Sequence, residues 1–210
     1  MSVEVAIFVV VVIAIVGWFA LGTHVNVRKG HRVLEWLQGG LPLLGEKTTL
    51  RWLGSSVVHL QIEKAREPFR RAEVLVVLEP RDVPPLWLLS RLRGRRDLLI
   101  VRTELRSVPK LQVEILDRQA WSTRAVDREV RQLQWQLVPS DGQPFQVYTL
   151  PPLSNFAELL AEAGGGGLAL VRVGVRRSDN SLEVQYLLPP QLACTARSVF
   201  EAVQRVAHRV

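Results

Sequence analysis

The chain has 210 residues, of which 48% are hydrophobic and 22% are charged, and its formal net charge is +7. This composition excludes an intrinsically disordered chain and suffices for the core of one ordinary domain or two small ones. The single cysteine, Cys194, excludes an intrachain disulfide and fits a reducing compartment. Most of the 27 basic residues are arginine, which suits phosphate or carboxylate recognition, although arginine-favouring codon usage beside anionic lipid would give the same composition.

An uncharged apolar run covers residues 5–21, with Trp18 and Phe19 near its C-terminal end. As a helix it would be ~26 Å long, close to the ~30 Å hydrocarbon thickness of a bilayer. Aromatic residues favour the membrane interface. A cleaved signal peptide would have a basic N-terminal flank and a shorter apolar core, and a buried soluble helix would show a polar face. We therefore predict a retained transmembrane anchor over residues 1–22.

The charges that flank this run predict its orientation. Arg28, Lys29 and Arg32 follow it, and no lysine or arginine precedes it. Basic residues near a span stay on the cytoplasmic side. We expect a single-pass protein of the cell membrane, with its N-terminus outside and its C-terminal domain in the cytoplasm.

Residues 23–46 are predicted to form a basic juxtamembrane segment and then a short amphipathic helix, which ends at Gly39 and Gly40. The sequence leaves two placements open for this helix, because it could lie in the membrane interface or pack against the domain. Beyond it, two strands are predicted over residues 48–53 and 57–63, on either side of Gly54 and Ser55, and the second alternates apolar and polar residues as a half-buried strand does.

Two later segments share one order of elements, residues 73–116 and residues 146–187. Each begins with a strand, then has a proline pair that marks a helix start, and then a short helix. Two strands with alternating apolar and polar residues follow and predict a hairpin. A further helix closes each unit. The proline pairs are Pro84-Pro85 and Pro151-Pro152, and the hairpin strands are 101–106 with 111–116 and 171–176 with 182–187. The last helix is predicted from the apolar stripe of Ala196, Val199, Phe200, Val203, Val206 and Ala207.

These elements predict the α+β class, with a transmembrane helix followed by a mixed-sheet domain that carries its helices on one side. The repeated order favours an internal duplication of strand-helix-hairpin-helix units, over residues 47–138 and 139–210, within one compact domain. The alternative is that two common arrangements resemble each other by chance.

The strongest local concentration of charge begins within the short helix predicted over residues 86–93. The candidate contact residues for an anion or a lipid headgroup are Arg91, Arg93, Arg95, Arg96 and Trp87. Helices that combine leucine, tryptophan and arginine bind anionic headgroups. A helix whose leucines face the core and whose arginines are merely solvated would have the same sequence. No nucleic-acid-binding signature accompanies the arginines, so nucleic acid is not an expected partner.

No catalytic, cofactor-binding or metal site is predicted. The glycine run at 164–167 follows a predicted helix, whereas a phosphate-binding loop precedes one. The histidines are scattered, and the lone cysteine, near the start of the last helix, is predicted to pack instead of react. These residues are His24, His31, His59, His208 and Cys194.

Three hypotheses on function follow, and the sequence leans against an enzyme without excluding one. The leading hypothesis is a non-catalytic binding or assembly module, an accessory subunit that contacts a protein partner in a membrane complex or a homo-oligomer. The second is a tethered domain that docks onto anionic lipid or another polyanion through an arginine-rich surface. The third is an enzyme whose site lies at the junction of the two repeated units.

Overall fold

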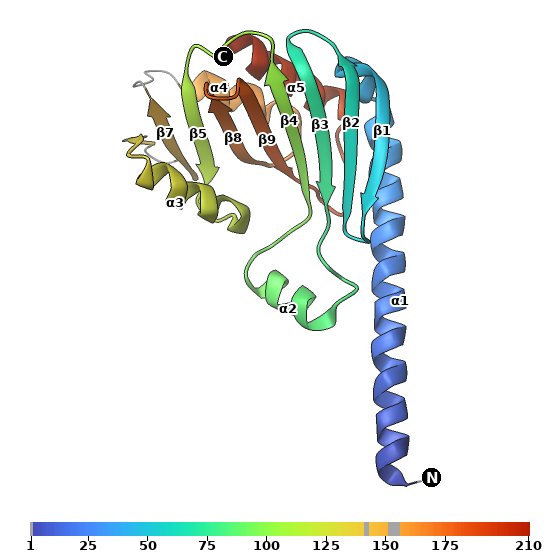
Figure 1. Cartoon of the computed structure of the whole chain (residues 1–210). Coiled ribbons are helices and arrows are strands. Elements are labelled where there is room, and N and C mark those ends of the chain that lie inside the picture. Colours follow the sequence, from blue (N-terminus) through green and yellow to red (C-terminus); the bar gives the residue numbers. More distant parts are fainter. Residues whose placement is uncertain (1, 141–142, 151–155) are drawn as a thin grey trace.

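The structure is a computed structural model that describes residues 2–140, 143–150 and 156–210. It consists of an α+β domain and one long helix, α1 (Val3–Gln38), whose N-terminal part projects from the domain (Figure 1). By length and composition α1 could cross a membrane, and it is the one helix among the described residues with this property. The predicted helix over residues 5–21 is confirmed.

The helix α1 does not end where its apolar run ends. It continues through residues 23–38, so the segment that the sequence predicts as a separate short helix forms its last turns. Most of the polar and basic residues there are good helix formers, and nothing in that segment stops the helix. Val33 and Leu37 are buried in the main core, so this segment packs against the domain. The 3-10 turn Leu41–Leu43 then leads into the sheet.

Within the described ranges, the strands form one sheet in the order β1-β2-β3-β4-β9-β8-β5-β7-β6. They are β1 (Gly45–Leu53), β2 (Val57–Ala65), β3 (Phe69–Val77), β4 (Leu98–Leu105), β5 (Gln112–Asp117), β6 (Gln136–Val138), β7 (Phe145–Leu150), β8 (Leu170–Arg176) and β9 (Ser181–Leu187). The two strands predicted first correspond to β1 and β2 and are confirmed.

The prediction of a mixed sheet is wrong, because all neighbouring strands in the described part of the sheet are antiparallel. The helix α2 (Pro84–Leu92) explains the difference. It begins at the predicted proline pair, but it projects beyond the strand ends instead of crossing a sheet face (Figure 1). The chain therefore returns from α2 in the direction opposite to β3.

One of the two predicted hairpins forms and the other does not. Strands β8 and β9 pair with each other as predicted. Strands β4 and β5 do not, because β9 and β8 lie between them. Corresponding strands of the two predicted units thus have different neighbours, and the sheet does not show a duplication. Pro151 and Pro152, which the sequence predicts to mark the start of the second unit's helix, lie outside the described residues, and the helix there begins at Ala157.

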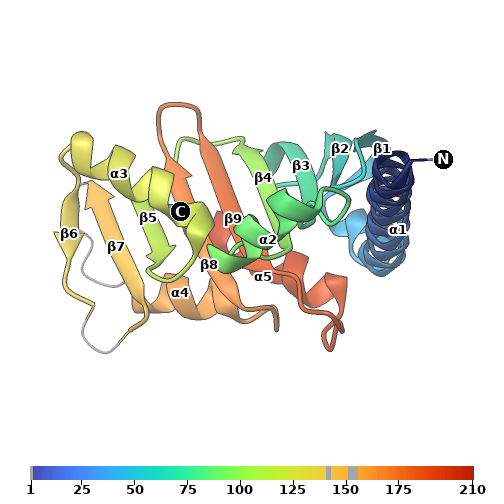
Figure 2. The same cartoon turned by 90° about the horizontal axis from the view of Figure 1, so that it is seen from below.

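Helices cover both faces of the sheet, although the sequence predicts them on one side. Figure 2 shows α4 (Ala157–Gly164) and α5 (Ala196–Arg209) on one face and α3 (Arg124–Gln132), preceded by the 3-10 turn Trp121–Thr123, on the other. The predicted apolar stripe of the last helix is confirmed, since all its members are buried against the main core. Val130 of α3 packs on a separate small core with Leu116 and Tyr148.

Candidate membrane-contact site

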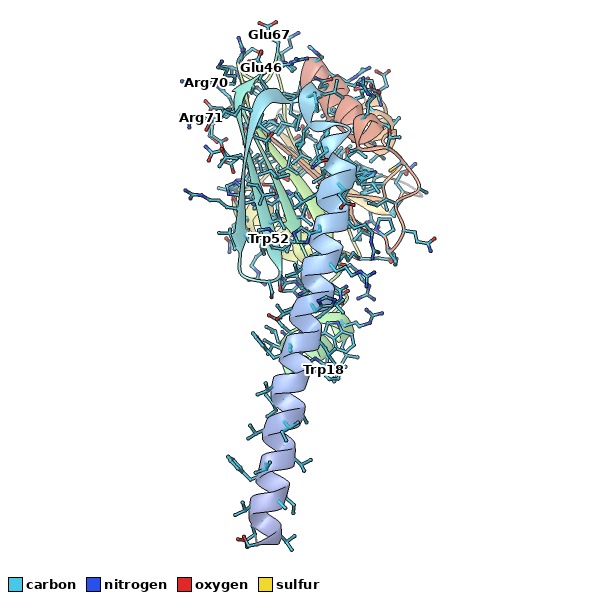
Figure 3. The ribbon with its side chains drawn as sticks, turned by 90° about the vertical axis from the view of Figure 1, so that its right-hand side faces the viewer. Trp18, Glu46, Trp52, Glu67, Arg70 and Arg71 are labelled. Atoms are coloured by element: carbon cyan, nitrogen blue, oxygen red, sulfur yellow. The ribbon has the colours of Figure 1, made fainter. Side chains whose placement is uncertain are left out.

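The C-terminal half of α1 contacts the domain along one stripe. Its buried members are Gly22, Asn26, Gly30, Val33 and Leu37, a spacing of three or four residues that places them on one helical face. The two glycines allow a close approach: a Cβ atom on Gly22 would lie 2.2 Å from the carbonyl oxygen of Arg81, and one on Gly30 would lie 2.4 Å from the Trp52 ring. Figure 3 shows Trp52 beside α1. This half of α1 is therefore an integral part of the domain.

A cluster of polar side chains joins α1 to the sheet and to the start of the α2 connection. We call it the junction cluster and define it as Asn26, Lys29, Glu79, Arg81 and Asp97. The fully buried Asn26 donates from Nδ2 to the Glu79 carbonyl oxygen at 3.0 Å and accepts from Arg81 at 3.1 Å. Asp97 pairs with the Lys29 ammonium at 2.5 Å and with both Nη atoms of Arg81 at 3.2 and 2.9 Å.

The charges of the junction cluster hold Asp97 ionised. Burial by itself would raise the pKa of this carboxyl. Hydrogen bonds from Arg81, Lys29 and the backbone amide of Glu79 outweigh it, so the pKa lies below its ordinary value. A buried pair of this kind costs several kcal/mol to break, because the remaining partner is left as an uncompensated charge. The connection between α1 and the domain is therefore rigid.

The residues predicted to flank the membrane span divide between two environments. The ammonium group of Lys29 is largely enclosed in the junction cluster. Arg28 and Arg32 lie on the exposed side of α1, next to His24 and His31. Within the described residues neither of these two arginines forms an ion pair, so both remain available to an external anion.

The helix α2 is attached to α1 at the end of its apolar run. The indole rings of Trp18 and Trp87 are 6.2 Å apart, and Trp18 donates from Nε1 to the Arg81 carbonyl oxygen at 3.0 Å. Trp87 donates in turn to Glu79 Oε2 at 2.9 Å, and the Arg91 guanidinium lies 3.4 Å from the same oxygen. Two of the predicted contact residues, Trp87 and Arg91, thus hold α2 in place. Figure 3 shows Trp18 beyond the body of the domain, on the projecting part of α1.

The remaining side of α2 presents leucines to the outside. Leu86, Leu88, Leu89 and Leu92 are 48%, 52%, 51% and 75% exposed. In an ordinary surface helix the apolar side faces the core, whereas here the side that faces the protein carries Ser90, Trp87 and Arg91. A contiguous exposed apolar face of this kind marks a site of contact with a membrane or another protein.

The other predicted contact residues follow α2 directly. Gly94, with a φ of +79°, ends the helix and turns the chain toward β4. Arg93, Arg95 and Arg96 form no ion pair within the described residues, and the Arg95 guanidinium lies 5.5 Å from the centre of the Trp121 ring. Unpaired guanidinium groups therefore border the exposed leucines.

A second charged cluster lies on the sheet face that α3 partly covers. Glu114 is fully buried and accepts two hydrogen bonds from Arg172 at 2.9 Å and one from Arg176 at 3.1 Å. Arg172 also pairs with Glu183 at 2.8 Å, and Arg176 with Glu129 at 2.6 Å. Burial opposes ionisation of Glu183, but the arginines outweigh it and lower its pKa. Arg102 also pairs with Glu183 at 2.7 Å, so three arginines balance three glutamates and the cluster supports the polar face of the sheet.

Other candidates for chemistry are isolated. Burial raises the pKa of the Cys194 thiol, which is half-buried against the main core, as expected for a packed cysteine. Across the described ranges, no three histidine, cysteine or acidic residues are placed to share a metal ion. Comparison with known protein families finds none that matches the chain, and comparison with curated proteins finds no significant match. Function is therefore inferred from the geometry alone.

Trp87 and the arginines after α2 are predicted from the sequence, but most of the junction cluster is not. Asn26, Arg81, Asp97 and Trp18 have no motif in common, and they come together only because α1 packs along the sheet. One signal is present in the sequence. Asn26 lies four residues from Gly22 and from Gly30, and a polar residue on a helical stripe of small residues indicates close packing with a hydrogen-bonding partner.

Proposed function

We propose that this chain is a single-pass membrane protein whose domain is held against the cytoplasmic surface of the bilayer at two points. The first is α1, which crosses the membrane with its N-terminus outside. The second is α2, whose leucines enter the interface beside the point where α1 leaves the hydrocarbon. The domain is the binding part of the molecule and presents its sheet to a protein partner in a fixed orientation.

The observation that carries this proposal is the position of the exposed leucines. They lie on α2, whose Trp87 ring packs against Trp18 at a tilt of 48°, and Trp18 belongs to the last turns of the apolar run. Tryptophan favours the interface between headgroups and hydrocarbon, so α2 reaches the bilayer at interfacial depth when α1 spans it. Since about half to three quarters of each leucine is exposed, its burial in the interface would contribute roughly 1–2 kcal/mol, and the neighbouring arginines would add attraction to anionic lipid.

The distribution of basic residues supports the proposed orientation. Arg28, Arg32, Arg93, Arg95 and Arg96 belong to the domain side of the apolar run, and the described residues before the run contain no basic side chain. Basic residues that adjoin a span stay in the cytoplasm. The continuous helix and the junction cluster would then transmit any tilt of the span to the domain, as expected for a module that positions a partner.

The depth of α2 in a bilayer tests this proposal. The full chain with Cys194→Ser is reconstituted in nanodiscs, and a fluorophore is placed at Leu92→Cys or, as a control at the far end of the sheet, at Arg66→Cys. Lipids with a nitroxide near the headgroup should quench the label at position 92 strongly and the label at position 66 little. Equal, weak quenching at both positions would contradict the docking of α2.

A further inference from the structure

A pocket of about 420 Å³ opens beside α2, at the end of the sheet nearest to the projecting part of α1. Its floor is apolar and comes from the ends of strands β3, β4 and β9. Its rim joins the loop that follows α2 to the turn that follows β5. The polar groups of this rim are Arg95, Arg96, Asp117, Gln119 and Ser122, and the Trp121 ring completes it.

The two arginines of the rim are held in place but keep their charge uncompensated by ion pairs. Arg95 lies over the Trp121 ring at 5.5 Å, and Arg96 donates from Nη1 to the carbonyl oxygens of Arg91 and Arg95 at 3.3 and 2.8 Å. A guanidinium stacked on an indole still presents its N–H edge, which matches a phosphate in a bidentate arrangement. The rim therefore offers two positioned phosphate-binding groups.

The rest of the rim suits hydroxyl groups. Asp117 Oδ1 already accepts a hydrogen bond from the backbone amide of Gln119 at 2.9 Å, and the carboxylate has further acceptor capacity. The Gln119 side-chain amide and the Ser122 hydroxyl can donate and accept. A carboxylate next to the arginines disfavours a ligand of high negative charge and favours a phosphodiester that carries free hydroxyls.

Arginines without an ion pair are concentrated at this end of the domain. Within the described residues they include Arg28 and Arg32 on α1, Arg93, Arg95 and Arg96 after α2, Arg118 after β5, and Arg124 and Arg128 in α3. At the opposite end, Arg70, Arg71 and Arg106 pair with glutamates, and Figure 3 shows Arg70 and Arg71 far from the span. Arg66 and Arg177, in turns at that opposite end, are also without an ion pair among the described residues, so most but not all of the unpaired charge faces the side on which a bilayer would lie.

We propose that the pocket between Arg95, Arg96 and Trp121 binds the headgroup of an anionic phospholipid of the phosphatidylglycerol type. The arginines bind the phosphodiester, and Asp117 and Ser122 bind the glycerol hydroxyls. The acyl chains extend along the exposed leucines of α2 into the bilayer. This inference rests on the proposed function, because it requires that α2 bring this end of the sheet to the membrane.

Lipid retention by the full chain tests the proposal. The chain is purified in non-ionic detergent, equilibrated with equal amounts of phosphatidylglycerol and phosphatidylcholine of identical acyl chains, and examined by native mass spectrometry. The variant R95Q/R96Q removes the two rim arginines. The matched control R66Q/R177Q removes two exposed, unpaired arginines from turns at the opposite end of the sheet, so both variants lose the same charge.

The wild type and the control should retain phosphatidylglycerol in preference to phosphatidylcholine, and R95Q/R96Q should lose this preference by about fivefold per arginine. If the double variant does not fold, R96Q alone should show a loss of about fivefold. Retention of both lipids without a headgroup preference would overturn the proposal that the pocket binds phosphatidylglycerol. An equal loss of preference in R66Q/R177Q would also overturn it. Quenching of a label at Leu92→Cys distinguishes failure of lipid binding in the pocket from failure of the docking of α2. The quenching should persist in R95Q/R96Q, because α2 still docks. Without docking of α2, the quenching would be absent even when both arginines are present.

Discussion

Lys29 and Asp97 form an ion pair of 2.5 Å that joins α1 to the start of β4. The pair lies two helical turns beyond the apolar run, and Asp97 also binds Arg81 in a bidentate manner. The carbonyl oxygen of Arg81 accepts a hydrogen bond from Trp18, and its guanidinium donates one to Asn26, so one cluster connects α1, the sheet and the start of the α2 connection. The helix α1 is therefore joined to the domain by a buried network of hydrogen bonds and ion pairs.

Removal of the Asp97 charge should loosen this connection. In Asp97→Asn, Lys29 and Arg81 lose their shared anion in a largely enclosed site, and we expect the free energy of unfolding to fall by about 3 kcal/mol. Denaturant titration of the full chain in detergent measures this change. Glu201→Gln, which removes an exposed partner of Arg197, is the control and should change stability by less than about 0.5 kcal/mol.

The effect of Asp97→Asn should depend on pH. The folded-state pKa of Asp97 is lower than its ordinary value of 3.8, so the charge stabilises the fold at any pH above that ordinary value. The contribution is lost as the pH falls through the folded-state pKa. The stability difference between wild type and variant should therefore be constant near neutral pH and shrink below about pH 4. A difference that grew with acidification would contradict this assignment.

Two glycines of α1 provide a matched pair for testing the helix contact. An added Cβ at Gly22 would lie 2.2 Å from a backbone oxygen, whereas Gly17 has open space around it. Gly22→Ala should destabilise the protein by about 1–3 kcal/mol and weaken the near-ultraviolet dichroism of the Trp18–Trp87 pair. Gly17→Ala should be neutral or stabilising, because alanine is the better helix former. Equal melting temperatures for the two variants would contradict the close approach.

The charged cluster on the sheet face should prove structural. Glu114→Gln leaves Arg172 and Arg176 without their buried anion, and we expect a loss of about 3 kcal/mol. Glu63→Gln removes a partner of Lys47 in a fully exposed pair and serves as the control. Calorimetric melting of both variants measures the difference. A Glu114→Gln protein as stable as the control would mean that the cluster does not support the fold.

Much of the fold follows from local sequence patterns. The apolar run, the alternation in β2, the proline start of α2 and the stripe of α5 each depend on neighbouring residues, and the structure confirms them. The neighbours of each strand could not be predicted, because alternation shows which face of a strand is buried but not which strand lies beside it. For this reason β9 and β8 separate β4 from β5 against expectation.

The candidate site was predictable only in part, for a similar reason. The arginines that follow α2 are conspicuous in sequence, but the sequence could not reveal that α2 turns its leucines outward. That outcome depends on Trp87 and Arg91, which bind Glu79 and Trp18 and so fix the inward side of the helix. Trp121 lies 26 residues after Arg95, and only the sheet topology brings the two together.

The proposed orientation of α1 in the membrane is tested by two cysteine substitutions in the Cys194→Ser background. A membrane-impermeant maleimide added to intact cells should label Ser2→Cys and should not label Arg66→Cys until the cells are opened. This expectation follows from the basic side chains on the domain side of the apolar run. Labelling of Arg66→Cys in intact cells would place the domain outside.

The most direct test of the account is a nitroxide scan across α2. Single cysteines at positions 83–93, in the Cys194→Ser chain in nanodiscs, are compared by spin relaxation with oxygen, which partitions into lipid, and with a water-soluble nickel complex. Docking of α2 in the membrane interface predicts high oxygen exposure at Leu86, Leu88, Leu89 and Leu92, and low exposure to both reagents at Ser90. Greater exposure to nickel than to oxygen at all four leucines would contradict it.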